Sequence, residues 1–329
     1  MSPASRSSVD WRPSASLSTL RARAQALARI RAFFACRGVL EVETPILCAS
    51  TATDPHLHSL RTTLGGVGGA SRSLYLHTSP EFAMKRLLAA GAGPIYQLCK
   101  VFRDGESGRL HNPEFTLLEW YRPGYDHHAL MDEVEALVDE LLATGAAERR
   151  SYFDVFEQHT GLNPARATVD RLRACARDHG FHGSEALSQG DRDLYADFLM
   201  GHVVCPHLGH ERPVFVSDFP ATQAAMARIR PGDPPVAERF ELFIKGIELA
   251  NGYHELTDAA EQRARFVEDN RRRELALSPV VLPDERLLAA LDQGLPACSG
   301  VALGVDRLMF LLVNATALSD VLSFPVQMA

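Results

Sequence analysis

The sequence predicts an α+β fold in which an antiparallel β-sheet is flanked by helices. Two blocks, residues 95–122 and 239–256, each contain a pair of apolar strands joined by a turn or a polar loop. Helical patterns lie between and after these blocks, but strands and helices do not alternate regularly as in a parallel βαβ sheet. No repeat of a solenoid or propeller period is present in the sequence. A Rossmann-type domain is therefore not expected.

The predicted elements follow from apolar spacing, which is three to four residues in helices and two in strands. Gly38 ends the first helix, Pro45 ends or bends the first strand, and residues 79–81 (Ser-Pro-Glu) have the features of a helix start. In chain order the sequence predicts a helix over Leu17 to Phe34, a strand at 39–47, two strands around a glycine-rich turn at 57–77, a helix from 79, two strands in 95–122 around a loop from Asp104 to Pro113, a strand at 214–220, a hairpin at 239–256 turning near Lys245-Gly246, a helix from Asp258 to Glu274, a strand at 299–305 and a helix at 306–314.

The composition is that of an average globular protein. Of the 329 residues, 46% are hydrophobic and 23% charged, which excludes disordered, collagen-like and coiled-coil classes for the chain as a whole. There are 34 basic and 41 acidic residues, so the net charge is −7, and the chain is not expected to wrap a long stretch of nucleic acid. The sequence has no apolar run of about 18 residues, which predicts that no segment spans a membrane.

The domain organisation is expected to be simple. Residues 1–16 are polar and rich in proline and serine, and they are interpreted as a disordered tail without a signal peptide. Residues 17–329 are interpreted as one domain that carries a mainly helical insertion at about 126–210. The six cysteines are scattered without a CxxC pair, which favours free thiols in a reducing cytoplasm over a disulfide framework.

The most polar block lies between the two strands of 95–122. Burying so many polar groups is costly unless a ligand satisfies them. Arginine holds phosphate oxygens in a fixed fork, and an aromatic ring stacks on a base. The block therefore predicts a nucleotide site, with a solvated, salt-bridged hairpin as the alternative. Its members are Arg103, Asp104, Glu106, Arg109, His111, Asn112, Glu114 and Phe115.

Three glutamates spaced by seven, Glu241, Glu248 and Glu255, lie in or just after the second hairpin. Carboxylates on adjacent strands are unfavourable neighbours unless a cation lies between them. Ligands that are all oxygen suit Mg²⁺ that is carried in with substrate phosphates. The alternative is that these residues are solvent-facing strand acids.

Glycines mark two further segments. In SGVALGVDRL, Gly300 and Gly304 allow a ligand to approach the strand, and Arg307 follows on the next helix, although such glycines also serve packing alone. The GGVGG segment at 65–69 is interpreted as a hairpin turn. Neither segment has the Gly-Lys-Ser/Thr ending of a phosphate-binding P-loop.

Histidines cluster at two places. His202, Cys205, His207 and His210 have ligand types and spacing that could bind zinc, but a polar loop is the preferred interpretation. The pair at 127–128 is interpreted as lying on the surface, because its sequence neighbourhood offers no partner.

Taken together, these motifs resemble the catalytic core of class II aminoacyl-tRNA synthetases, and within them the lysine branch. GVLEVETPIL is similar to the family's dimer-forming first motif, VFRDGESGRLHNPEFTLLEWY to its second and SGVALGVDRL to its third. TSPE at 78–81 and IELANGYHEL at 247–256 are similar to signatures of the lysine enzymes. The resemblance covers roughly residues 17–314 and implies the class II catalytic fold.

Only about sixteen residues precede the first helix, too few for the anticodon-binding domain of lysyl-tRNA synthetases. This points to a truncated branch, the elongation factor P–lysine ligases. That resemblance implies activation of (R)-β-lysine or lysine with ATP and Mg²⁺, and transfer to a lysine of elongation factor P. It further implies a homodimer through 17–45 and no stable tRNA binding, with the protein partner guided by Arg109 or by the 263–273 helix.

The resemblance also implies individual roles. The expected catalytic residues are Arg103 and Arg307, and the expected Mg²⁺ ligands are Glu241 and Glu248. The expected ATP-binding residues are Arg103, Asp104, Gly105, His111, Asn112, Phe115, Glu248, Leu249, Gly304 and Arg307. The expected substrate-binding residues are Ser79, Pro80, Glu81, Tyr121, Asn251, Glu255 and Ala302.

Two positions depart from the family pattern. Gly105 stands where a glutamate is usual, with Glu106 following, and Ala302 replaces a glycine of the lysyl-tRNA synthetases, which favours a β-amino acid substrate. The alternatives are an ammonia-dependent asparagine synthetase of the same fold, a truncated lysyl-tRNA synthetase, and a catalytically inactive regulatory relative. Glu255 argues against an acidic substrate, and the arginines and glutamates argue against inactivity.

Overall fold

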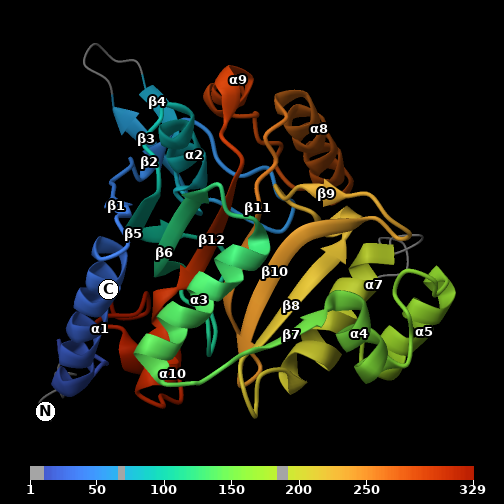
Figure 1. The fold of residues 1–329 in the computed structure, drawn as a ribbon, viewed down its shortest axis with the longest axis horizontal. Helices are drawn as coiled ribbons and strands as arrows, with labels where there is room; N and C mark the ends of the chain where they lie inside the picture. The colour runs from blue at the N-terminus through green and yellow to red at the C-terminus, as the bar shows by residue number, and fades with distance from the viewer. Residues whose placement is uncertain (1–10, 66–70, 184–191) are drawn as a thin grey trace, which may run out of the picture.

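A large mixed sheet forms the centre of the protein. The structure, a computed structural model, describes residues 11–65, 71–183 and 192–329. Within these ranges nine strands pair in the order β1-β5-β6-β12-β11-β10-β8-β7, and β9 pairs with β10 outside this path (Figure 1). They are β1 (Leu40–Glu41), β5 (Ile95–Phe102), β6 (Glu114–Pro123), β7 (Glu148–Ser151), β8 (Val214–Pro220), β9 (Ile229–Arg230), β10 (Val236–Ile244), β11 (Ile247–His254) and β12 (Cys298–Gly304).

The pairing confirms the predicted α+β fold. All neighbouring strands are antiparallel except at the two edges, where β1 with β5 and β7 with β8 are parallel. The predicted hairpin turn between β10 and β11 is also confirmed. Lys245 and Gly246 both have positive φ, 52° and 73°, which matches the turn to the twist of its strands.

The predicted strand at 39–47 is wrong as one element. It is divided into β1 and β2 (Leu47–Cys48), because Pro45 has no N–H to donate to a ladder. While β1 joins the main sheet, β2 pairs with β4 (Ser71–Leu76), which also pairs with β3 (Arg61–Gly65) in a separate small sheet. Except for Gly65, the predicted glycine turn lies outside the described residues.

The helices cover both faces and one end of the sheet (Figure 1). Side-chain caps fix several starts, for example Ser16, Asp126 and Asp258, whose side chains accept from N–H groups of the first turn. The helix after Asp284 was not predicted. The described helices are α1 (Leu17–Ala35), α2 (Glu81–Ala89), α3 (His127–Leu142), α4 (Tyr152–Thr160), α5 (Val169–Asp178), α7 (Arg192–Leu199), a π-helical turn (Met200–Val204), α8 (Ala259–Leu275), α9 (Glu285–Gly294) and α10 (Val305–Leu312).

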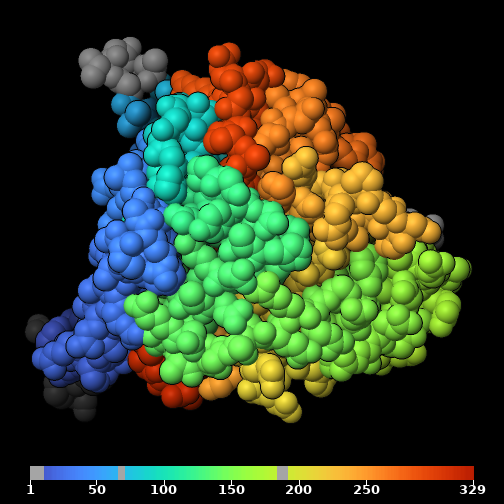
Figure 2. Space-filling view, in the orientation of Figure 1, coloured from blue at the N-terminus to red at the C-terminus, as the bar shows by residue number. Residues whose placement is uncertain are grey.

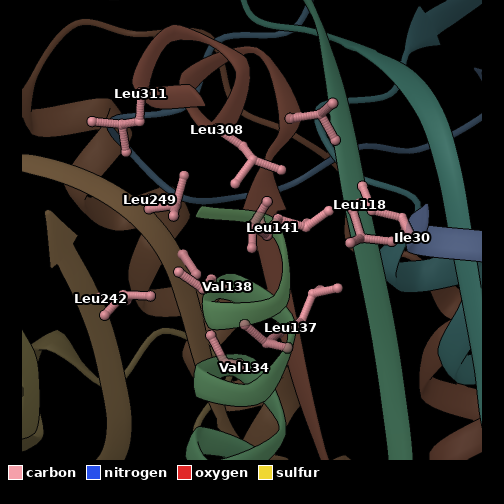
Figure 3. Packing of buried hydrophobic residues seen from close by; sticks show 14 of the residues in the cluster. Ile30, Leu118, Val134, Leu137, Val138, Leu141, Leu242, Leu249, Leu308 and Leu311 are labelled. Carbon is pink, nitrogen blue, oxygen red and sulfur yellow. The ribbon is translucent and has the colours of Figure 1, made fainter. Parts of the chain in front are cut away.

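The main hydrophobic core lies between one face of the sheet and α1, α3 and α10. Figure 3 shows Val134, Leu137, Val138 and Leu141 of α3 lying between Leu242 of β10 on one side and Leu118 of β6 on the other. The first part of the predicted insertion therefore belongs to the central core. The rest of the predicted insertion, α4, α5 and α7, packs on β8 around a second hydrophobic cluster. In Figure 2, α1, α3 and these helices cover the side of the molecule that faces the viewer.

Residues 14 and 15 pair with a C-terminal segment just before α1 begins. Residues 1–10 of the predicted tail lie outside the described residues. Ser14 donates its N–H to the carbonyl of Ser323 at 2.9 Å, and Ala15 is buried, so packing begins before the first helix. No helix in the described ranges is long and apolar enough to cross a membrane. All six cysteines, each within those ranges, are free thiols.

Candidate active site

A cavity of about 440 Å³ lies on the sheet face opposite α3. Its wall includes fourteen of the residues that the sequence predicts for the site, from four separate segments of the chain. They are Ser79, Glu81, Arg103, His111, Asn112, Phe115, Tyr121, Glu248, Leu249, Asn251, Glu255, Ala302, Gly304 and Arg307.

The floor of the cavity is β12, whose small residues lie between larger ones on β6 and β11. Gly300 is paired with Tyr121 on one side and Tyr253 on the other, and Ala302 with Glu119 and Asn251. A Cβ atom at Gly300 would overlap the ring of Tyr121 and the carboxylate of Glu255. Glycine is therefore required at this position for those two groups to face the same space.

The closed end contains a buried lysine that the sequence did not predict. Lys85 lies one helical turn after Glu81 on α2, is 1% exposed, and forms ion pairs with Glu81 Oε1 at 2.7 Å and Glu255 Oε2 at 2.6 Å. The hydroxyl of Tyr253 also donates to Glu81 Oε1, at 2.6 Å. Glu255 Oε1 has no hydrogen-bond partner among the described residues, so it remains free to accept from a ligand.

Glu119 is a third carboxylate of this end, and the sequence analysis missed it. It is 2% exposed and accepts hydrogen bonds from Ser79 Oγ and the Tyr121 hydroxyl, both at 2.7 Å. Tyr121, expected beside Glu255, thus bonds Glu119. Strand periodicity is the signal that could have identified Glu119, because residues two apart on β6, such as Glu119 and Tyr121, lie on the same face of the sheet.

Burial makes these carboxylates reluctant to ionise without a ligand. Burial, together with the neighbouring charge of Glu81 and against the opposing charge of Lys85, raises the pKa of Glu255 to about 8 and that of Glu119 to about 7. Burial alone would lower the pKa of Lys85, but the carboxylates of Glu255 and Glu81 more than offset this and raise it. When all are ionised, three carboxylates face one ammonium, which leaves two negative charges to be balanced by a cationic ligand.

We expect lysine to bind this pocket more tightly as the pH rises from about 6 to about 8. The folded protein keeps protons on Glu119 up to about pH 7 and on Glu255 up to about pH 8, whereas the unfolded chain loses them near pH 4.5. These two groups therefore destabilise the empty protein as the pH rises from about 4.5 to about 8. A cation requires the charged forms, so binding releases protons and strengthens by up to about tenfold per pH unit for each proton. Calorimetry in two buffers of different ionisation enthalpy measures this release. A flat profile for the wild type, or an equally steep one for Glu119→Gln, would contradict the assignment.

The open end contains the two predicted catalytic arginines. Arg307 donates to the backbone oxygen of Glu248 at 2.8 Å and lies 2.8 Å from His111 Nε2. Burial, with the charge of Arg307, lowers the pKa of His111, which keeps its ring neutral and able to accept from the guanidinium. The Arg103 guanidinium lies 5.0 Å from the centre of the Phe115 ring. Two cations beside an aromatic ring suit a nucleotide phosphate and base.

Several predicted residues do not line the cavity, namely Pro80, Asp104, Gly105 and Glu241. Glu106, which follows Gly105, does line it and lies 3.7 Å from Arg103. Asn112 lines it too, but its side-chain amide donates to the Glu114 carbonyl and accepts from the Val326 N–H, so it also holds the loop to the C-terminal segment.

The two expected Mg²⁺ ligands, Glu241 and Glu248, are near each other, and each interacts with an arginine. Glu241 accepts from Arg239 Nη2 at 2.6 Å, and Glu248 lies 3.6 Å from Arg307. The pKa of Glu241 is raised to about 7, because burial and the negative charge of Glu248 outweigh the opposing charge of Arg239. Two neighbouring carboxylates beside a cleft suited to phosphates are oxygen donors of the kind that Mg²⁺ takes. The residues present fit this ion.

The two histidine predictions have different outcomes. His202 and His210 each direct a ring nitrogen at a backbone oxygen, of Phe198 at 3.1 Å and Pro206 at 2.7 Å, and in the described part of the chain they do not gather with other ligands. The surface interpretation of His127 is wrong, because this side chain is 2% exposed and lies near Glu238 and His254, partners that are remote in sequence. Burial and His128 lower the pKa of His127 to about 4.

The basic helix suggested as a docking surface is largely neutralised. Arg263 pairs with Glu285 and Arg265 with Glu261, while Arg271 and Arg272 share Glu268. Arg273 is buried and donates to backbone oxygens of residues 53, 54 and 57, holding that segment over the cavity. Arg109, the other suggested guide, is exposed and lies in the loop that carries His111 and Asn112.

The model of the class II tRNA synthetases (D, K and N) matches residues 3–328. The chain belongs to this family. Among its class II relatives, the elongation factor P–(R)-β-lysine ligase of Pectobacterium carotovorum subsp. carotovorum is 52% identical over 322 residues, which are 98% of this chain and 99% of the relative. Proteins of the same name from Sodalis glossinidius and Haemophilus influenzae are 52% and 50% identical over 326 and 320 residues, 98% and 97% of this chain and 99% and 98% of theirs.

Proposed function

We propose that this protein activates (R)-β-lysine, or lysine, with ATP and transfers it to a lysine side chain of elongation factor P. The observation that carries the proposal is the closed end of the cavity, where Glu81, Glu119 and Glu255 face a single lysine. The relatives that share its full length bear this activity in their names. Two unbalanced negative charges match the two ammonium groups of a lysine-type substrate.

The first step would join the substrate carboxylate to the α-phosphorus of ATP and release pyrophosphate. The carboxylate is ionised at neutral pH, so this step needs no general base and depends on position and charge. Arg103 would hold the α-phosphate and the carboxylate, and Arg307 the outer phosphates, with Phe115 against the base. Glu241 and Glu248 would hold Mg²⁺, which, when bound, neutralises phosphate charge.

The pocket supports a dicationic substrate over the alternatives. Glu81 would take the amine near the carboxylate, and Glu255 with Glu119 the distal ammonium. An aspartate side chain in the same place would face three carboxylates, which disfavours an asparagine synthetase. Ala302, between Glu119 and Asn251, would limit the space beside the substrate backbone and so affect the choice between α- and β-lysine.

The acceptor prediction separates a protein ligase from a truncated tRNA enzyme. With a net charge of −7 and a neutralised α8, the chain should modify elongation factor P and leave tRNA unlabelled. Incubation with ATP, labelled β-lysine, elongation factor P and bulk tRNA in one tube tests this, and the label should be found on the protein. Label on tRNA alone would overturn the proposal. We place the reaction in the cytoplasm, in keeping with the free thiols.

We also propose that the protein is a homodimer through the 17–45 segment and the two residues that follow it. Leu17, Leu40, Ile46 and Leu47 are all at least 39% exposed, an apolar set that water disfavours. Light scattering at micromolar concentration should give twice the 36.1 kDa chain mass. The double variant Ile46→Asp, Leu47→Asp should be monomeric, whereas Leu277→Asp, at a residue 91% exposed elsewhere, should remain dimeric. A fully active wild-type monomer would contradict this prediction.

A further inference from the structure

A second group of polar side chains lies on the sheet face opposite the substrate cavity. His127 comes from the first turn of α3, Glu238 from β10 and His254 from β11. One donor atom of each lies within 4.8 Å of the other two, and His254 Nδ1 is 2.7 Å from Glu238 Oε2. All three side chains are mostly buried. Neither the family resemblance nor the proposed reaction uses them together.

His127 has the feature that points to a ligand. It is 2% exposed, yet neither ring nitrogen has a hydrogen-bond partner among the residues that the structure describes. A buried polar group without a partner costs about 1–3 kcal/mol, so such groups are uncommon unless something else satisfies them. Its ring lines a cavity of about 400 Å³ that Glu238 and His254 also line, which leaves room for an ion and a water molecule.

The backbone holds the three positions firmly. Asp126 caps the start of α3 by accepting from the Ala129 N–H at 2.8 Å, which fixes the turn that carries His127. The backbone of Arg228 links the backbones of His254 and Glu238. Its N–H donates to the His254 carbonyl at 2.8 Å, and its carbonyl accepts from the Glu238 N–H at 2.9 Å. A ligand set from three elements with fixed backbones needs only side-chain adjustment to close around an ion.

The surrounding charges tolerate a cation. Arg230 lines the same cavity and lies 2.7 Å from Asp218 and 3.7 Å from Glu238 Oε1. The carboxylate of Asp218 therefore balances most of the positive charge of Arg230. Glu238 Oε2 is turned toward His254 instead. The cavity is lined by Asp126 and Glu238 and by the arginines at 228 and 230, and the pairing of Arg230 with Asp218 leaves the carboxylates in excess.

We propose that His127, Glu238 and His254 form a binding site for a divalent transition metal of the zinc class. Two imidazoles and one carboxylate are the ligand set that zinc takes in sites with an open position, and here the fourth position faces the cavity. The proposal does not depend on the lysine activity, because the site and the substrate cavity lie on opposite faces of the sheet.

Metal binding by the full chain tests the proposal directly. The purified protein is stripped with a chelator and titrated with Zn²⁺ by equilibrium dialysis, in excess Mg²⁺ so that the glutamates of the substrate cavity are occupied. We expect about one tightly held ion per chain, and Co²⁺ in its place should give the visible absorption of a four-coordinate site. His127→Ala should weaken binding at least tenfold, since even residues that only support metal ligands contribute about 10–100-fold.

The controls separate this site from other histidines and from misfolding. His128→Ala changes an exposed histidine that lines the same cavity but is not one of the three proposed ligands, so it should weaken binding far less than His127→Ala does. The double variant His202→Ala, His210→Ala should bind normally. If His127→Ala fails to fold, as judged by its metal-free melting curve, His127→Gln replaces it and should show the same loss. No binding by the wild type, or loss only in the His202 and His210 variant, would overturn the proposal.

Discussion

Replacing Glu255 with glutamine is expected to reduce lysine activation by about 30-fold to several thousand-fold. Glu255 is buried at the closed end of the cavity, where it pairs with Lys85 at 2.6 Å and keeps Oε1 free for a ligand. The amide removes one negative charge and leaves a bound ammonium partly unpaired, which costs about 2–5 kcal/mol. The same change frees Lys85 from one partner, and its positive charge then repels the substrate.

Pyrophosphate exchange dependent on lysine or β-lysine measures this loss. ATP binding to the Glu255→Gln protein should change little, because the arginines and Phe115 line the other end of the cavity. Glu285→Gln is the matched control, since it neutralises an exposed carboxylate that pairs only with Arg263 in the described structure. An equal loss of ATP affinity would move Glu255 into the nucleotide site and contradict the assignment.

The second large effect is expected for Arg103→Lys. This change keeps the positive charge but loses the planar fork that can hold two oxygens at once. If Arg103 bridges the α-phosphate and the substrate carboxylate, the rate of exchange should fall by about 10²–10³-fold, comparable with removing one donor to a developing charge. The Michaelis constant for lysine should change far less, because the ammonium groups bind at the other end.

The structure supports this separation of effects. The Arg103 guanidinium lies over Phe115, and its Nε has no hydrogen-bond partner among the described residues. Arg109→Lys is the control, at an exposed arginine of the same loop. A rate for Arg103→Lys within a few-fold of wild type, with a raised Michaelis constant for lysine, would show that Arg103 contributes only uniform binding.

The sequence by itself determined most of the elements and the chemistry at the open end of the cavity. The polar loop after Arg103, the turn at Lys245-Gly246 and the glycines of β12 are local patterns, and local patterns specify turns, caps and strand faces. The order of the motifs was enough to indicate the family to which the chain belongs. Those predictions needed no knowledge of which strands are neighbours.

Only the tertiary structure decided which buried charges meet. Lys85 has the pattern of an ordinary helical lysine in the sequence, and its role follows from Glu255, 170 positions later, reaching the same enclosed space. His127 lacked a partner in its own segment, because Glu238 and His254 come to it across the sheet. Burial strengthens charge interactions and shifts pKa values, and burial is a property of the packed fold, which local sequence does not contain.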